Sequence, residues 1–197
     1  MHSNSITENE IKYIFIKECP ELKKYFTQVS INKILSKNIS VVEAISRIVI
    51  GQMLSRKVSN VIINRAENIA GVYNIALLSE TEMRVCGISN SKARAIKLFA
   101  EQYFNDVPYY ENWRNLESDK LFAEVNKHWG LSNWTASMLA IFYFGFEDVY
   151  PVNDGSIKRV THLLEQKGIV FDPDKAKPFR SYLALYLWEI LDKKLIT

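Results

Sequence analysis

The sequence predicts an all-α protein. Its 197 residues are 48% hydrophobic and 24% charged, which is the composition of an ordinary globular domain. Apolar residues recur at helical spacing in one segment after another, and no segment shows sustained alternation of period two. Gly 7 and Pro 5 are too few for the turns of a loop-rich β-sandwich.

The first expected helix runs from Ser40 to Leu54. Its apolar residues recur at intervals of three and four, so they share one face of the helix. These inward positions are Val41, Ile45, Ile48, Val49 and Met53. The pattern therefore predicts a helix whose one side, Met53 included, packs on a core.

Two helices follow in the middle of the chain. The capping box Ser79-x-x-Glu82 begins a short helix, and Gly87 ends it. The next helix spans Ser89 to Phe104. Its inward positions are Ala93, Ile96 and Ala100.

The second half of the chain continues the helical pattern. Leu121, Phe122, Val125 and Trp129 form one helix, which Gly130 ends. The segment Ser132–Phe146 is apolar on nearly every side and is expected to be a central buried helix. Asp154 precedes an amphipathic helix, and Phe179–Leu191 is the last one. The inward positions after Asp154 are Ile157, Val160, Thr161 and Leu164.

Composition excludes several classes of protein. Two cysteines, Cys19 and Cys86, cannot form a disulfide framework or a cysteine-ligated cluster, and three scattered histidines are too few for a metal site. Met1 to Glu10 lacks the features of an export signal. The longest apolar run, Met138 to Phe146, is half of the ~20 residues that a membrane span needs. We expect a cytoplasmic protein, associated with the nucleoid if the source is prokaryotic, with no membrane contact.

Two segments have the pattern of a helix–hairpin–helix motif. They read Val85-Cys-Gly-Ile-Ser-Asn-Ser-Lys-Ala93 and Trp129-Gly-Leu-Ser-Asn-Trp-Thr-Ala136. In the second, the backbone N–H groups of Gly130, Ser132 and Thr135 lie at or near a helix N-terminus, which suits a DNA phosphate. The same residues also fit a plain glycine-terminated turn between two helices. The net charge of +3 permits nucleic-acid binding without indicating it.

Four motifs in order carry a family resemblance. They are Ile50-Gly-Gln-Met-Leu-Ser55, Gly130-Leu-Ser-Asn-Trp-Thr-Ala136, Tyr150-Pro-Val-Asn-Asp-Gly-Ser-Ile-Lys-Arg159 and Lys177-Pro-Phe-Arg-Ser-Tyr182, the last extending to Trp188. Together they resemble the helix–hairpin–helix DNA glycosylase superfamily, in its alkylbase branch of the 3-methyladenine glycosylase II type. The resemblance implies one compact unit of two helical lobes with a catalytic cleft between them. Residues 39–148 would form a six-helix barrel with the hairpin, and 1–38 plus 149–197 the second lobe.

Asp154 matches the catalytic aspartate of that family. Cleavage of an N-glycosidic bond develops positive charge on the deoxyribose, and a carboxylate beside the sugar stabilises that charge and orients a water molecule. The alternative is that Asp154 only caps the following helix. The family often has Asp-Asp here, whereas this chain has Asn153-Asp154, so Asp154 is the one carboxylate available.

The resemblance also assigns a base pocket. Trp134 stands where glycosylase-lyases place a lysine nucleophile, which implies hydrolysis without strand cleavage. Trp134, Met138 and Trp188 would line the pocket, because an aromatic wall attracts the cationic ring of an alkylated purine. Aromatic residues at helical spacing are equally explained as core residues.

The remaining assignments concern DNA contacts. Met53 matches the wedge that fills the gap left by the extruded nucleotide, and Gln52 would contact the opposite strand or the backbone. Met53 also fits the end of a buried helix. Ser132 replaces the usual glycine of the hairpin. By the same resemblance, the carbonyl groups of Asn126, His128 and Leu131 would hold a monovalent cation, with no side-chain metal site.

The leading hypothesis is a monomeric enzyme without a cofactor that excises alkylated purines from double-stranded DNA by base flipping. Three alternatives stay open. The same fold could serve a non-catalytic module that binds damaged DNA, or a glycosylase for uracil or oxidised bases. An all-α regulatory domain, in which the hairpins are only turns, would show no salt-dependent affinity for DNA.

Overall fold

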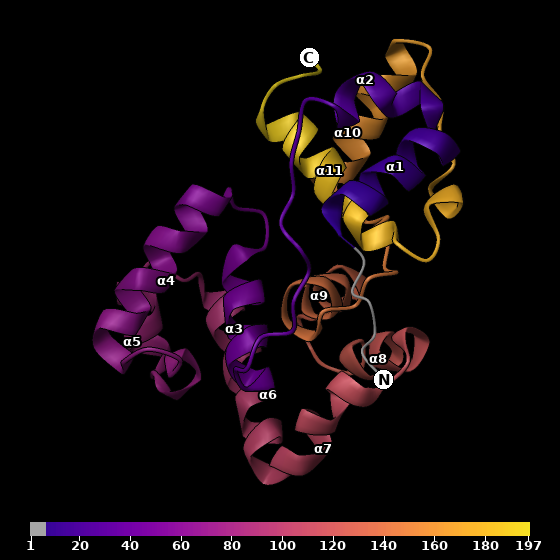
Figure 1. Cartoon of the computed structure of the whole chain (residues 1–197). Helices are drawn as coiled ribbons and strands as arrows, with labels where there is room; N and C mark the ends of the chain where they lie inside the picture. Colours follow the sequence, from indigo (N-terminus) through magenta and orange to yellow (C-terminus); the bar gives the residue numbers. More distant parts are fainter. Residues whose placement is uncertain (1–6) are drawn as a thin grey trace. The chain divides into compact units, whose positions relative to one another are not determined.

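The structure, a computed structural model, describes residues 7–197. The first six residues, which belong to the segment inspected for an export signal, lie outside the described part. Throughout residues 7–197 the regular secondary structure is helical and contains no strand, which confirms the predicted all-α class (Figure 1).

The chain divides into two compact units. One comprises Lys37–Phe144, and the other combines the described residues up to Ser36 with Gly145–Thr197. The boundaries expected from the resemblance, 39–148 for the first lobe, lie within a few residues of this division. Each unit is described below by itself.

The unit Lys37–Phe144 is built from short and medium helices joined by tight turns. They are α3 (Val41–Gly51), α4 (Arg56–Ala70), η2 (Ile75–Leu77), α5 (Glu80–Val85), α6 (Asn90–Asn105), α7 (Val107–Glu111), η3 (Asn112–Asn115), α8 (Ser118–Val125), α9 (Asn133–Leu139) and the π-helical segment η4 (Ala140–Phe144). Helix α3 contacts α4, α6 and α9 and forms the centre of the unit.

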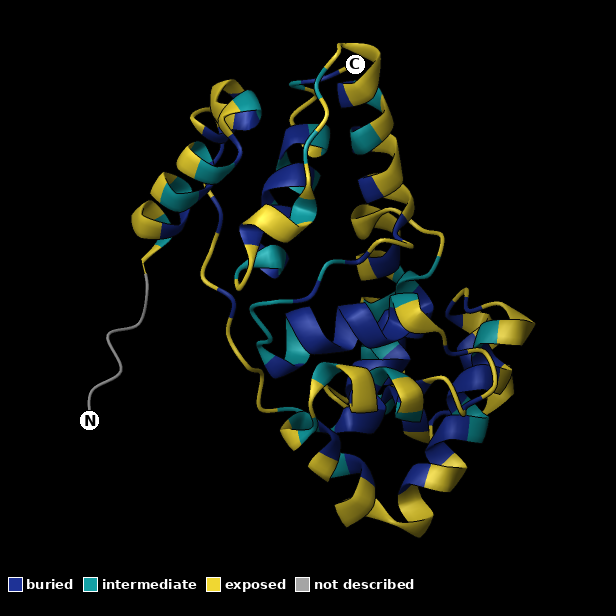
Figure 2. Ribbon diagram, turned by 90° about the vertical axis from the view of Figure 1, so that its right-hand side faces the viewer, coloured by how far each residue is buried: buried dark blue, intermediate teal, exposed yellow. Residues whose placement is uncertain are grey.

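Burial explains why α3 is central. Every residue of α3 except Arg47 and Gly51 is buried, and most of α9 is buried as well (Figure 2). Two of the buried residues of α3 are polar, Ser46 and Glu43. Glu43 is fully buried, pairs with Arg47 at 2.9 Å and accepts the backbone N–H of Ile75 at 3.0 Å. Burial raises the pKa of Glu43. A buried carboxylate needs such partners, and here they join α3 to η2.

The other unit brings both ends of the described chain together. Its helices are α1 (Glu8–Glu18), η1 (Pro20–Leu22), α2 (Lys23–Phe26), α10 (Gly155–Gln166), η5 (Pro173–Ala176) and α11 (Arg180–Asp192). In Figure 1, α1 and α2 (indigo) lie beside α10 and α11 (orange to yellow). Phe15, Phe26 and Tyr186 pack ring against ring in the core, with centroids 5.2–5.8 Å apart. Residues far apart in sequence therefore share one core.

Most predicted helices and their inward positions are confirmed. The Ser79 capping box begins α5, Ala93, Ile96 and Ala100 are buried in α6, and α10 begins directly after Asp154. Helix α4 has no counterpart among the sequence predictions. Its exposed apolar residues, Val58 and Val61 among them, gave only a weak pattern.

Three helix ends differ from prediction. Helix α3 ends at Gly51, so Met53 lies outside it and is fully exposed, not on the inward face. Helix α8 ends at Val125, because the N–H groups of Lys127 and His128 bond to carbonyls three residues back and tighten the last turn. The prediction of an inward Trp129 is therefore wrong, because half of its surface is exposed. The Arg94 guanidinium lies over its ring, 4.9 Å from the centroid. The helix from Ser132 widens into η4, and Lys37 N–H bonds to the Tyr143 carbonyl there.

Within residues 7–197, no helix is both long and apolar enough to span a bilayer. Cys19 and Cys86 are buried free thiols, one in each unit.

Candidate functional site

Asp154 is the N-cap of α10. Its Oδ1 atom accepts the backbone N–H groups of Ser156 and Ile157, each at 2.9 Å. The residue is buried, with 9% of its surface exposed. The capping interpretation of Asp154 is thus correct as a description of local geometry. It does not exclude catalysis, because the same bonds hold a carboxylate at the positive end of a helix.

Trp188 reaches the same oxygen from another helix. Its indole Nε1–H donates to Asp154 Oδ1 at 2.9 Å, and the side chain is half-buried in α11. Oδ1 therefore accepts N–H groups from two elements, which sets the direction of the whole carboxyl group. The sequence assigned Trp188 only to a base pocket. The observed hydrogen bond lets Trp188 orient Asp154, and its place in a base pocket stays a prediction.

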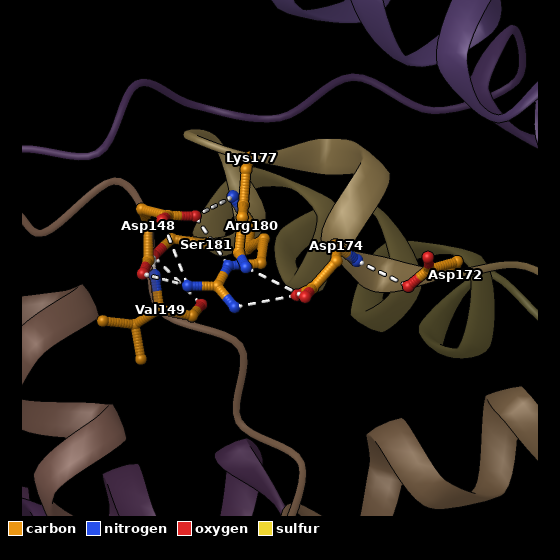
Figure 3. A network of polar contacts seen from close by, with 7 residues as sticks. All are labelled: Asp148, Val149, Asp172, Asp174, Lys177, Arg180 and Ser181. Atoms are coloured by element: carbon orange, nitrogen blue, oxygen red, sulfur yellow. Dashed lines mark hydrogen bonds and ion pairs between the residues drawn. The ribbon is translucent and has the colours of Figure 1, made fainter.

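Side chains in the first turn of α11 bond to residues 147–149, which precede Asp154 in the chain. The Arg180 guanidinium forms a two-pronged pair with Asp148, with Nε to Oδ1 at 2.7 Å and Nη2 to Oδ2 at 3.1 Å (Figure 3). The Ser181 hydroxyl accepts the Val149 N–H at 2.9 Å, and Tyr182 Oη donates to Glu147 at 2.9 Å.

Three consecutive residues of α11 thus fix three consecutive residues, 147–149, a few positions before Asp154. Figure 3 shows Arg180 also reaching Asp174 on η5, with Nη1 to Oδ1 at 3.0 Å. Sequence reasoning gave Arg180 no role, although it lies inside the motif Lys177–Tyr182. An arginine paired with an aspartate 32 residues away leaves no local signal.

The second hairpin lies in the unit Lys37–Phe144. Gly130 has φ +79, and a Cβ there would meet the Cβ of Ala95 at 2.8 Å, so only glycine fits. Ser132 and Thr135 form a capping box at the start of α9, in which Ser132 N–H donates to Thr135 Oγ1 at 3.2 Å. One of the N–H groups expected to face a phosphate is thus held by a hydroxyl within the hairpin. Ser132 is compatible with the helix start, as a good N-cap residue should be.

The turn after α3 carries Gln52 and Met53. Leu54 N–H bonds to the Gly51 carbonyl at 3.1 Å, with Gln52 at φ −51, ψ 128 and Met53 at φ 58, which is a type II turn. That position favours glycine, so a fully exposed methionine there is unusual. The Gln52 Nε2 atom donates to the Gly130 carbonyl at 3.3 Å and to Thr135 Oγ1 at 3.4 Å. The turn and the second hairpin are therefore in direct contact.

Trp134 and Met138 lie one turn apart on α9 and share a face. Met138 is buried and Trp134 is half-buried. The position that would hold a lysine nucleophile carries the indole of Trp134.

The resemblance implies a monovalent cation on three carbonyl groups of the second hairpin. These are the carbonyl groups of Asn126, His128 and Leu131, and that of His128 accepts the Leu131 N–H at 3.2 Å. The His128 ring packs against Phe99 and Trp113, and its buried Nδ1 atom has no hydrogen-bond partner among the described residues. A carbonyl oxygen has two lone pairs, so the cation site on these carbonyls stays a prediction. Within residues 7–197, no group of three His, Cys, Asp or Glu side chains has the arrangement of a metal site.

The predicted site residues therefore form two groups. Asp154 and Trp188 are bonded to each other in one unit, and Gln52, Met53, Gly130, Ser132 and Thr135 adjoin one another in the other, which also holds Trp134 and Met138. The first group presents an oriented carboxylate that can stabilise positive charge and direct a water molecule. The second presents an exposed apolar side chain beside a hairpin.

Comparisons with known proteins find similar DNA glycosylases. No family model matches the chain. DNA-3-methyladenine glycosylase 1 of Schizosaccharomyces pombe is 29% identical over 161 residues, covering 75% of this chain and 71% of that protein. Alkylbase DNA glycosidase-like protein mag2 of the same organism is 27% identical over 163 residues, covering 75% and 76%.

A solved structure shares the fold. The 3-methyladenine DNA glycosylase Mag1 of Schizosaccharomyces pombe, in complex with abasic DNA, superimposes with a TM-score of 0.79 at 24% identity, over 93% of this chain and 97% of that one. The four motifs, the helical fold and these relatives agree. The chain is similar in sequence to alkylbase DNA glycosylases, and it shares the helical fold of a 3-methyladenine DNA glycosylase.

Proposed function

We propose that this chain is a DNA N-glycosylase that hydrolyses the N-glycosidic bond of alkylated purines, such as 3-methyladenine, in duplex DNA. The observation that carries the proposal is the Asp154 carboxylate, whose Oδ1 is held by two backbone N–H groups and the Trp188 indole. The names and substrates of the relatives support the same class of reaction.

The chemistry follows from the charge that develops on the sugar. As the bond between C1′ and the base nitrogen breaks, its electron pair leaves with the base, and C1′ becomes cationic. The Asp154 carboxylate stabilises that charge and orients a water molecule. The water oxygen then bonds to C1′, and its proton passes to Asp154 or to solvent. The products are a free base and an abasic site.

An alkylated purine suits this machinery because it carries a positive charge. Methylation at N3 or N7 makes the base a good leaving group, so no second acid is required. The indole of Trp134, which shares a face of α9 with Met138, would hold the cationic ring by stacking and cation–π attraction. With an indole at position 134, the chain has no amine there to form a Schiff base with the sugar. We therefore propose hydrolysis without strand cleavage.

The target base must leave the duplex before it can react. Extrusion costs a few kcal/mol, and Met53, apolar and fully exposed, would fill the gap in the base stack. Gln52 would contact the opposite strand or the backbone, while the hairpin at Gly130, Ser132 and Thr135 would hold a phosphate. We propose that the protein does this as a monomer, which sedimentation of the protein with a short duplex would test.

The decisive experiment compares the wild type with Asp154→Asn in the release of free methylated bases from methylated duplex DNA. Asparagine caps a helix about as well as aspartate, so this change removes the charge and keeps the cap. Asp106 offers a matched control, because it caps α7 by accepting the Tyr109 N–H at 3.1 Å. We expect Asp154→Asn to slow release by about 100-fold or more, and Asp106→Asn to leave it near wild type.

Other outcomes separate the alternatives. Equal release by wild type and Asp154→Asn would overturn the role of Asp154. Salt-sensitive DNA binding without release from any substrate would indicate a binding module instead of an enzyme. Faster excision of uracil or an oxidised base than of methylated purines would overturn the proposed substrate class. Strand cleavage at the product site, trapped with borohydride, would overturn the monofunctional mechanism.

A further inference from the structure

The first hairpin motif places a lysine against the turn that carries Met53. Lys92 lies in the first turn of α6, and its Nζ donates to the carbonyl oxygen of Ile50 at 2.9 Å and to that of Gln52 at 2.6 Å. The side chain is half-buried, and burial lowers its pKa. A lysine so placed points into the protein and is not a solvated surface charge.

The Ile50 carbonyl is one that the end of α3 leaves without an intrahelical partner, and the Gln52 carbonyl belongs to the turn that follows. Helix α3 ends at Gly51, so the carbonyls at its last turn need other donors. A cation near the C-terminus of a helix is also favoured by the helix dipole. Lys92 meets both requirements from a separate helix, 40 residues later in the chain.

The turn needs this support because its geometry is unfavourable. Met53 adopts φ 58, a left-handed conformation that a residue with a side chain rarely takes, and such residues persist only where the surroundings hold them. Besides the turn's own hydrogen bond from Leu54 to Gly51, Gln52 is held on two sides. Its side chain contacts the second hairpin at Gly130, and its carbonyl accepts the Lys92 ammonium group.

We propose that Lys92 is a positioning residue for base extrusion, which locks the Gln52–Met53 turn so that Met53 stands ready to enter the base stack. The inference rests on the proposed function. A turn fixed in advance loses little conformational freedom when the wedge inserts, so more of the binding energy is left to extrude the base. The first hairpin then serves as a support for the wedge turn.

The test compares Lys92→Met with a matched control on the same helix. Lys97 Nζ also donates to a carbonyl oxygen, that of Ala76 at 3.3 Å, but away from the wedge turn. Lys97→Met removes the same charge and the same kind of bond. Both variants are assayed by single-turnover release of 7-methylguanine from two duplexes. In one the damaged base faces cytosine, and in the other it faces an abasic-site analogue, so that extrusion costs little.

We expect Lys92→Met to slow release about 10-fold or more from the cytosine duplex and at most about 3-fold from the abasic-opposed duplex. Lys97→Met should be near wild type on both. In the absence of DNA, amide hydrogen exchange at Leu54 should be faster in Lys92→Met, because the turn opens more often. Lys92→Arg, which keeps charged donors, should recover part of the lost rate.

The results that overturn the inference differ from those that overturn the function. An active wild type with equal slowing of Lys92→Met on both duplexes would make Lys92 a general structural residue. Unchanged rates for Lys92→Met, or unchanged exchange at Leu54, would refute the positioning role. Absence of base release from wild-type protein would overturn the proposed function and, with it, this inference.

Discussion

The hydrogen bond between Trp188 and Asp154 leads to a sharp prediction. Trp188→Phe keeps an aromatic ring in α11 but removes the Nε1–H that donates to Asp154 Oδ1 at 2.9 Å. The other two donors to that oxygen, Ser156 and Ile157, are backbone groups of α10 and are unaffected by the substitution. The variant therefore removes the donor that reaches Asp154 from α11.

The size of the effect follows from the bond's chemistry. A hydrogen bond to a charged group contributes about 1.5–3 kcal/mol. About 1.4 kcal/mol of transition-state stabilisation corresponds to a tenfold change in rate. Because we expect the transition state to need this orientation of the carboxylate, loss of the bond should slow base release by ~10- to ~150-fold. Affinity for the duplex should change little, because the capping bonds still hold Asp154 in place.

The assay is single-turnover release of 7-methylguanine from duplex DNA, with DNA affinity measured by fluorescence anisotropy. Trp113→Phe, in the core of the other unit, controls for the general effect of exchanging the rings. A Trp188→Phe rate within about 3-fold of wild type would refute the orienting role. If Trp188→Ala were then severely impaired and bound damaged DNA weakly, stacking in a base pocket would be its role instead.

Three further predictions concern stability. Arg180→Lys replaces the two-pronged pair with Asp148 by at most one contact, so we expect a loss of about 1–3 kcal/mol in chemical unfolding and slower base release. Burial lowers the pKa of His128, so the unfolded chain binds more protons than the folded chain and the free energy of unfolding should fall as the pH drops below about 6.5. Urea unfolding of the wild type and of His128→Phe at a series of pH values measures this effect, and the variant should lack the part of the pH dependence that is due to His128. Gly130→Ala should cost about 1–3 kcal/mol in the same assay and weaken DNA binding, since its Cβ would meet Ala95 at a φ of +79; a variant as stable as wild type would contradict the close approach.

The sequence alone was sufficient for the fold class and for most of the helices. Helical periodicity, the capping box at Ser79 and the glycines that end helices are local signals, and α5, α6, α10 and α11 formed where those signals lie. The motifs indicated the same class of protein as the relatives that the comparisons found. They also identified Asp154 as the candidate carboxylate, because it is the one acidic residue at that point of the motif.

Local patterns failed where tertiary contacts decide a helix end. Periodicity placed Met53 on an inward face, although a turn held by Lys92 and Gln52 leaves it fully exposed. Trp129 likewise fitted the apolar pattern of α8. The hairpin instead turns it outward beside Arg94.

The arrangement around the candidate carboxylate was decided by the tertiary structure. Asp154 and Trp188 are 34 residues apart, and no periodic pattern relates them. Their hydrogen bond exists only because α11 packs against α10. The pairs Arg180–Asp148 and Lys92–Gln52 have the same character. Amino-acid spacing encodes interactions within a few residues, where backbone geometry fixes which side chains meet. A hydrogen bond between distant segments depends on how their helices pack, and a single sequence contains no periodic signal for that.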